Sequence, residues 1–322
     1  MSRSFKRMSL GLALAVVALI ARAQEFPSQP IRIVVPFPAG GVADVIARSV
    51  SQKVADQMQA SVVVDNRGGA DGMIGAEFGA KSKPDGYTLL LANLPVMVIN
   101  ALQYSNLTYD AGEFTSIVML ADQPYLVAIH PSVPARTLGE LIQLGKRYPD
   151  RLTFGTASSS VYLAGELLKN LGGFNMTRIP YKGGAPALND LLGGHTNLII
   201  TAVVTAAPHI KTGRLRGLAI TAPKRSPIVP DIPTAAEAGT KGFEITSWQG
   251  IVGPAGLPAA VVQRFNAEFN QALKAPDVIA LLNSQGVSIV GGTPAQFSRF
   301  IAEESKLWSG IAKSAKLVKQ KL

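Results

Sequence analysis

The segment that decides the fold is IRIVVPFPAGGVADVIARSV, residues 31–50. Its β-forming residues stop at two prolines, a glycine pair follows, and a helical pattern begins at Val42. A helix that starts in this way leaves its first N–H groups without intrahelical acceptors, so the layout suits the binding of an anion. The turn lacks the third glycine of G-x-G-x-x-G and the Gly-Lys-Ser/Thr of a P-loop, which favours a carboxylate over a phosphate. Taken alone, a structural glycine turn explains the same residues equally well.

The first 23 residues have the pattern of a secretory signal peptide. Basic residues up to Arg7 precede an apolar run over 10–20, and Ala21-Arg22-Ala23 forms an A-x-A cleavage site. The run is shorter than the about 20 residues that span a bilayer. We therefore expect cleavage after Ala23 and a periplasmic location, with an uncleaved anchor as the alternative. The chain has no cysteine, which excludes a lipid-modified cysteine and disulfide bonds.

The net charge favours a small anionic ligand over nucleic acid. The formal charge is +10, and the leader holds four of the basic residues and no acidic one, which leaves +6 after cleavage. A modest positive field attracts small anions, although solubility explains it as well. No stripe of interleaved basic and aromatic residues is present, so no nucleic-acid partner is expected.

Apolar runs bounded by turn residues alternate with helical patterns along the chain. Strands are expected at 31–35, 62–65, 88–92, 117–120, 126–129, 152–154, 198–201, 215–220 and 247–252, and helices at 42–58, 137–147, 161–171, 185–192, 258–272 and 294–316. This alternation predicts an α/β fold with parallel sheets covered on both faces.

The order of these elements predicts two doubly wound α/β domains joined by a two-crossover hinge. The strand–turn–helix unit recurs from Leu152, and a connection rich in proline and glycine covers 222–243. The expected first domain is discontinuous, with residues 24–123 and 249–322, and the second covers 124–248. Hinged pairs of this kind close around ligands.

A second helix start, FGTASSSVYLAGELL (154–168), carries four hydroxyl groups at Thr156, Ser158, Ser159 and Ser160. One hydroxyl is enough for a helix N-cap, which contributes about 1 kcal/mol. The remaining hydroxyls and free N–H groups are suited to hold a carboxylate, with about 1.5–3 kcal/mol for each charge-assisted hydrogen bond. Two helix starts that face one cleft would bind an organic acid without arginine.

Catalytic and metal-binding interpretations find little support. The histidines, His130, His195 and His209, lack the spacing of a metal pair, and no G-x-S-x-G motif is present. Asp44 and Asp65 are conceivable general bases, so an exported hydrolase or isomerase is kept as an alternative. Asp44 more simply complements the helix dipole or nearby N–H groups. We expect no enzymatic activity, no cofactor and no metal.

Seven segments together resemble the solute-binding proteins of tripartite tricarboxylate transporters, also called Bordetella uptake gene (Bug) products. They are PIRIVVPFPAGGVADVIAR (30–48), VVVDNRGGADGMIGA (62–76), PDGYTLLLA (84–92), LAGELL (163–168), IPYKGGAPALNDLLGG (179–194), LRGLAITAPKRSPIVPDIPTAAEAG (215–239) and TSWQGIVGPAGLP (246–258). The resemblance implies a periplasmic binding protein-like fold of type II that encloses an organic acid between its domains. It also implies a monomer that delivers the ligand to membrane permease subunits. A sensing protein for a receptor or sensor kinase would share the same fold and site.

The resemblance also implies which residues contact the ligand. They are Phe37, Pro38, Ala39, Gly40, Gly41, Ala43 and Asp44 at the first helix start, Asn93 after the third strand, Thr156, Ala157, Ser158, Ser159, Ser160 and Tyr162 at the second helix start, Tyr181, Lys182 and Gly183 in the P-Y-K-G turn, and Thr201 and Trp248.

Several positions depart from the family pattern. Ala43 stands where many members have Thr or Ser, Tyr162 where a histidine is common, and Thr201 where relatives often carry aspartate. Asn93 begins a stretch, NLPVM, in place of a Ser/Thr-rich loop. Each change removes polarity or charge from the expected cleft, and an unpaired buried ammonium group would be costly. We therefore expect a carboxylate with an apolar or aromatic body to be preferred over an amino acid.

Overall fold

Strand β1 (Ile31–Val35) and helix α2 (Val42–Met58) occupy the predicted positions in a computed structural model that describes residues 26–156, 158–181 and 183–321. The expected leader, Ala157 and Lys182 lie outside the described residues. Gly40, with a φ of 86°, allows the turn between the strand and the helix. The strand is buried on both faces apart from Arg32, as its continuous apolar sequence indicates.

The remaining elements alternate as an α/β fold requires. The strands are β2 (Val62–Asn66), β3 (Thr88–Asn93), β4 (Thr115–Ile129), β5 (Thr153–Thr156), β6 (Thr177–Pro180), β7 (Leu198–Ala202), β8 (Arg216–Ile220), β9 (Thr246–Gly253) and β10 (Ser288–Ile289). The helices are α3 (Met73–Ala80), α4 (Asn100–Gln103), α5 (Leu138–Arg147), α6 (Ser159–Gly172), α7 (Gly184–Leu192), α8 (Val203–Lys211), α9 (Ala259–Ala272), α10 (Pro276–Ser284) and α11 (Pro294–Ser314), with short turns η1 (Ala70–Gly72), η2 (Pro95–Ile99) and η3 (Ala111–Glu113).

The sheet is mixed, which corrects the expectation of parallel sheets. Its strand order is β2-β1-β3-β9-β4-β7-β5-β6, with β8 and β10 also paired to β4. β1 is parallel to β2 and β3, and β5 is parallel to β6 and β7. All four partners of β4 are antiparallel to it. The doubly wound halves are therefore joined through antiparallel strands.

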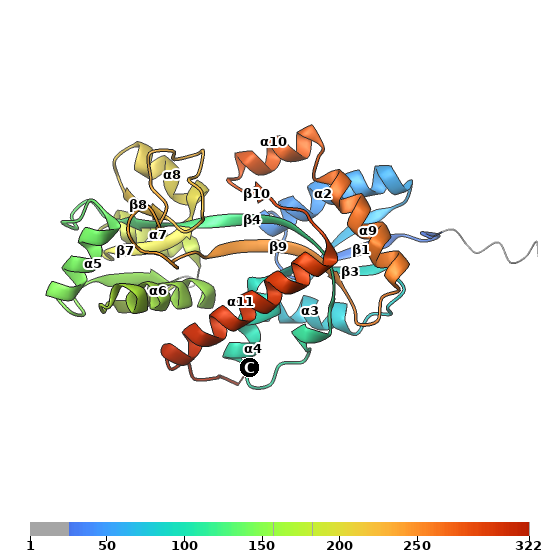
Figure 1. The fold of residues 1–322 in the computed structure, drawn as a ribbon, viewed down its shortest axis with the longest axis horizontal. Coiled ribbons are helices and arrows are strands. Elements are labelled where there is room, and N and C mark those ends of the chain that lie inside the picture. The colour runs from blue at the N-terminus through green and yellow to red at the C-terminus, as the bar shows by residue number, and fades with distance from the viewer. Residues whose placement is uncertain (1–25, 157, 182, 322) are drawn as a thin grey trace, which may run out of the picture.

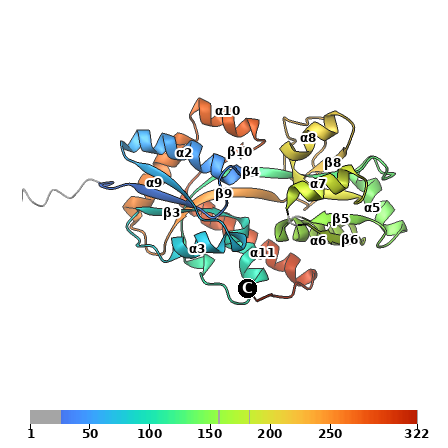
Figure 2. The same cartoon turned by 180° about the vertical axis from the view of Figure 1, so that it is seen from behind.

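β4 is one strand where the sequence pattern indicated two, at 117–120 and 126–129. Its first part pairs with β9 as far as Pro124 and Thr246, and its last part pairs with β7 and β8. Figures 1 and 2 show β4 and β9 running between two lobes, each covered by its own helices. The polar and proline residues over 122–124 look like a turn in the sequence, but they form the crossing between the lobes.

A single threonine connects the end of β8 with the start of β9, the second strand that runs between the lobes. Thr221, just after β8, donates its backbone N–H to Tyr125 O at 3.0 Å. Its hydroxyl lies 2.6 Å from Ile245 O, just before β9. The chain therefore leaves one edge of β4 after β8 and returns to the same edge as β9. Residues 222–244 form the long connection that the proline and glycine content predicted.

Four helices were not expected from periodicity. α3 contains two glycines because its face packs closely on neighbouring backbone: a Cβ at Gly75 would lie 2.8 Å from Pro36 Cα. α4 has only four residues, α8 contains Pro208, and α10 begins with a proline directly after a short connection. Weak propensity and short length explain why a pattern search misses them.

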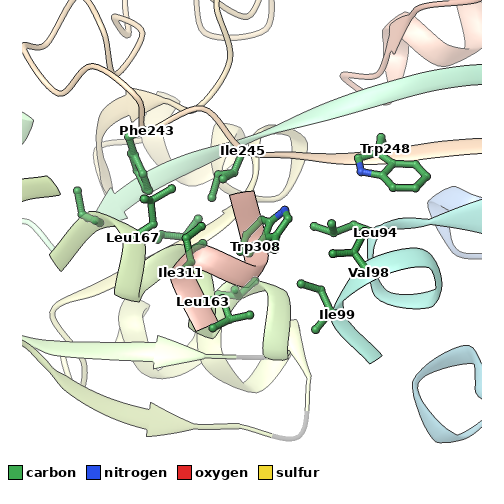
Figure 3. Packing of buried hydrophobic residues seen from close by; sticks show 14 of the residues in the cluster. Leu94, Val98, Ile99, Leu163, Leu167, Phe243, Ile245, Trp248, Trp308 and Ile311 are labelled. Atoms are coloured by element: carbon green, nitrogen blue, oxygen red, sulfur yellow. The ribbon is translucent and has the colours of Figure 1, made fainter. Parts of the chain in front are cut away.

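Helix α11 packs against both lobes. It contacts α6 in the second lobe and η2 in the first, and Asn170 Nδ2 donates to Ser314 Oγ at 2.7 Å. Figure 3 shows Ile311 of this helix beside Leu167 of α6, and Trp308 on the side toward Val98 and Ile99 of η2. These side chains belong to one continuous apolar cluster, so the core extends across the two lobes.

A half-buried carboxylate joins α11 to β9. The indole N–H groups of Trp248 and Trp308 both donate to Glu304 Oε2, at 3.2 and 3.0 Å. Trp248 is fully buried and packs edge-on against Phe297 and Phe300. Burial raises the pKa of Glu304, and the two indole hydrogen bonds oppose that effect only in part.

We expect the substitution Glu304→Gln to change how stability depends on pH. The raised pKa means that the folded chain binds this proton more tightly than the unfolded chain, so stability is lost as the pH rises above about 4.5 and through the folded pKa. The glutamine variant lacks this loss. Its free energy of unfolding, relative to that of the unsubstituted chain, should therefore rise between about pH 4 and about pH 8 in urea titrations.

The exposed neighbour Glu303 supplies a matched control, since Glu303→Gln should leave the pH dependence unchanged. A stability difference between the Glu304→Gln variant and the unsubstituted chain that stays constant over the pH range would contradict the prediction.

Candidate ligand-binding site

A cavity of about 490 Å³ lies where the two lobes meet the crossing strands. The first lobe contributes the β1–α2 turn and the residues after β3, the crossing strands contribute alternate residues of β4 and β9, and the second lobe contributes the start of α6. The described lining residues are Phe37, Pro38, Ala39, Gly41, Val42, Ala43, Asn93, Leu94, Pro95, Gln123, Tyr125, Ser158, Ser160, Ser247 and Gln249. Both predicted helix starts therefore face one cavity.

Asp44 holds the β1–α2 turn in shape from outside the cavity. Its Oδ2 accepts the Gly40 N–H at 2.9 Å and Arg48 Nε at 3.0 Å, and its Oδ1 accepts Asn66 Nδ2 at 2.9 Å. Asn66 also donates to Phe37 O at 3.1 Å. Burial alone would raise the pKa of Asp44, but these hydrogen bonds outweigh it and lower the pKa. Both carboxylate oxygens are thus occupied in bracing the turn.

The first turn of α2 presents free backbone donors to the cavity. Gly41 is the N-cap and offers no side-chain hydrogen bond, while Gly41 O accepts the N–H of Val45. The N–H groups of Val42, Ala43 and Asp44 therefore have no intrahelical acceptor. The helix dipole places partial positive charge at the same point, which favours an anion there.

The second helix start divides its hydroxyl groups between structure and cavity. Ser158 caps α6 by accepting the Val161 N–H at 3.3 Å, and it also lines the cavity. Ser160 lines the cavity and is 5% exposed. Thr156 is buried and accepts from Arg178 Nε at 3.1 Å. Two of the four hydroxyls named from the sequence therefore reach the cavity.

The other residues named from the sequence lie beside the described cavity lining or away from it. Gly40 is held by Asp44, and Ser159 belongs to the first turn of α6. The Tyr162 ring lies under the Arg178 guanidinium, whose Cζ is 4.2 Å from the ring centroid. The remaining four are Tyr181, whose hydroxyl donates to Asp190 at 2.7 Å, Gly183 at the start of α7, Thr201 on β7 opposite Leu126, and Trp248, which faces α11.

Four polar residues on the crossing strands were missed by the sequence reasoning. Gln123 and Tyr125 alternate along β4, and Ser247 and Gln249 alternate along β9. Val42 was also missed, whereas Leu94 and Pro95 belong to the NLPVM stretch that was expected at the cleft. The period-two pattern of polar residues around Trp248 was the available signal. It becomes useful only when β9 is known to pass beneath the cavity.

Hydrogen bonds link part of this polar strip. Gln249 Nε2 donates to Ser247 Oγ at 3.3 Å, and Ser247 hydrogen-bonds the Tyr125 side chain. Burial raises the pKa of Tyr125, and the bond to Ser247 opposes that rise. Tyr125 is therefore a neutral phenol at neutral pH. Gln123 Nε2 is occupied by Gln285 O at 3.0 Å.

The lining is uncharged among the residues that the structure describes. It has hydroxyl, carboxamide and apolar groups, but no histidine, aspartate, glutamate, lysine or arginine. No group of three metal-ligating side chains occurs in the described ranges. Within those same ranges no helix is long and apolar enough to cross a membrane. The partial positive charge at this cavity therefore comes from the backbone N–H groups at the starts of α2 and α6.

Comparisons with known proteins place the whole chain among transport receptors. Residues 46–317 match the model of the tripartite tricarboxylate transporter family receptor, TctC. Protein BugT of Bordetella pertussis is 34% identical, over 97% of this chain and 97% of its own. The R. palustris protein Rpa4515, solved with adipate, is 32% identical with a TM-score of 0.79, over 92% of this chain and all of its own. MatC of Rhodopseudomonas palustris, solved with bound malate, is 30% identical with a TM-score of 0.74, over 89% of this chain and all of its own.

We expect Asp44→Ala to lower the free energy of unfolding by about 2–3 kcal/mol at neutral pH, because it leaves the Gly40 N–H and two side-chain donors without their acceptor. The lowered pKa makes this stabilisation present above about pH 4, and it is lost as the pH falls through the folded pKa. Urea titrations at about pH 7 and about pH 3 should therefore show a smaller effect in acid.

The exposed Asp56 on the same helix is the matched control, because among the described residues its carboxylate accepts only from the exposed Gln52, at 3.1 Å. Asp56→Ala should change stability by less than about 0.5 kcal/mol. Equal losses in the two variants would show that Asp44 does not brace the turn.

Proposed function

Because the chain belongs to the tripartite tricarboxylate transporter receptor family, we propose that it captures a small organic acid in the periplasm and delivers it to the membrane permease of a tripartite transporter. The observation that carries the proposal is the cavity at which two helix starts meet. The free N–H groups of α2 and the hydroxyls of Ser158 and Ser160 form an anion site without a lysine or arginine among the described lining residues.

The carboxylate is proposed to lie between the β1–α2 turn and the α6 start. The contacting residues would be those that both the sequence and the cavity single out: Phe37, Pro38, Ala39, Gly41, Ala43, Asn93, Ser158 and Ser160. Carboxylate ligands occur among the structural relatives, with adipate in one and malate in another. Micromolar affinity requires about 8 kcal/mol, which two or three charge-assisted hydrogen bonds and an apolar body can supply.

The two lobes are proposed to be domains of residues 24–123 with 249–322 and of residues 124–248. The change of partners along β4 supports this division, because β9 pairs with β4 as far as Pro124 and β8 pairs from Leu126. Export through a leader cleaved after Ala23 and a monomeric state complete the proposal. We propose no catalysis, since the described cavity lining offers no general base or nucleophile–base pair.

A thermal-shift panel tests the ligand class. The panel contains aspartate, glutamate, citrate, aliphatic acids and aromatic acids, and the largest rise in Tm is expected with an acid that has an apolar or aromatic body. A ligand at 100 times its Kd stabilises the fold by about 2.7 kcal/mol, which such an assay detects. A strong shift with aspartate or glutamate alone would contradict the preferred ligand, and no shift with any acid would contradict the binding function.

The position of the carboxylate is tested at Ala43, which lines the cavity in the first turn of α2. Ala43→Asp places a negative charge beside the free N–H groups, so every carboxylate that binds the unsubstituted chain should bind at least about tenfold more weakly by calorimetry. Ala43→Ser adds a hydroxyl without charge and should change affinity by less than about threefold. Equal losses in the two variants would point to crowding and not to charge.

A further inference from the structure

The end of the cavity formed by the crossing strands carries an incompletely paired polar group. We define the hinge wall as Tyr125, Ser247 and Gln249, which all line the cavity. Gln249 is 4% exposed, and its Nε2 donates to Ser247 Oγ. Its Oε1 has no hydrogen-bond partner among the described residues. A buried acceptor of this kind costs about as much as a lost hydrogen bond, so it calls for a donor.

The carboxamide is able to meet a donor that enters the cavity. Its terminal torsion joins an sp³ to an sp² carbon and is therefore broad, with no strong barrier to a small rotation. Ser247 holds the nitrogen end, which leaves the oxygen as the free end. None of the described lining residues is charged, so none of them offers a charged donor to this oxygen.

The hinge wall also contains a hydrogen-bond donor, the Tyr125 hydroxyl, in addition to the acceptor Gln249 Oε1. Ser247 has one hydroxyl proton and accepts from Gln249, so its own proton is available to the Tyr125 oxygen. Tyr125 lines the same wall, and its phenol hydroxyl both donates and accepts hydrogen bonds. Its proton can therefore be donated to a group in the cavity.

A second negative charge on the ligand meets no charged partner among the described lining residues. The described lining contains no lysine or arginine, and Arg48 of α2, which lies outside that lining, donates to Asp44 and Asn66. An unpaired charge taken out of water is far more costly than an unpaired hydroxyl. A free donor beside a free acceptor matches a hydroxyl or a carboxamide, both of which donate and accept.

We propose that the hinge wall is a subsite for an uncharged hydrogen-bonding group, so that the preferred ligand is a monocarboxylate with a distal hydroxyl or carboxamide and not a diacid. This inference rests on the proposed function, because the two helix starts must hold the single carboxylate. It names Gln249 and Tyr125 as the residues that set specificity.

The test uses two matched series of acids with calorimetry on the full mature chain. One series is hexanoate, 6-hydroxyhexanoate and adipate, and the other is benzoate, 4-hydroxybenzoate and terephthalate. In at least one series the hydroxy acid should bind about tenfold or more tightly than both the plain acid and the diacid. A diacid that binds as tightly as the hydroxy acid in the series that binds best would overturn the proposal while leaving the proposed function intact. Absence of binding by all six acids would overturn both the subsite and this form of the carboxylate function.

Two variants assign the effect to the hinge wall. Gln249→Leu and Tyr125→Phe should each reduce the ratio of hydroxy-acid affinity to plain-acid affinity to within about twofold of unity. The exposed Gln143 of α5 supplies the control, and Gln143→Leu should keep the full ratio. Because the readout is a ratio within one protein, a general loss of stability would leave it unchanged. A ratio that persists in both hinge-wall variants would overturn the assignment.

Discussion

Strand β4 is the element on which the rest of the structure depends, because both lobes use it to satisfy their backbone hydrogen bonds. Its first part pairs with β9 and β10, and its last part pairs with β7 and β8. A strand that is buried in two half-sheets cannot change register in one without disturbing the other. β4 therefore connects the two lobes directly, and α11 adds a second connection through the shared apolar cluster.

The sequence predicted the elements that are defined by local signals. The β1–α2 unit, the long helices and the apolar strands were placed to within a few residues, because hydrophobic periodicity and glycine turns act over short distances. The single β4 strand was not predicted, since Gln123 and Pro124 resemble a turn until their partners on β9 are known. Short helices such as α8, with an internal proline, depend on tertiary contacts and leave a weak pattern.

The same distinction separates the parts of the site that were found from those that were missed. The two helix starts are contiguous in sequence, so their glycine and serine residues were identified. On β9, Trp248 was the predicted site residue, whereas Ser247 and Gln249 line the cavity and Trp248 packs against Phe297 of α11. Successive residues of a strand point to opposite faces. A prediction that is wrong by one position therefore selects a residue that faces the core and not one that faces the cavity. The face of β9 that meets the cavity is fixed by α11, nearly fifty residues later.

In the proposed mode of binding, the two ends of the cavity have different physical constraints. The carboxylate is held by N–H groups of α2 that belong to the backbone, so side-chain substitution leaves most of that interaction in place. The hinge wall consists of side chains on strands that both lobes share. In this mode the backbone continues to bind the carboxylate when side chains change, while substitution at Gln249 or Tyr125 changes which acid is accepted. A receptor built in this way can acquire a new ligand without rebuilding its anion site.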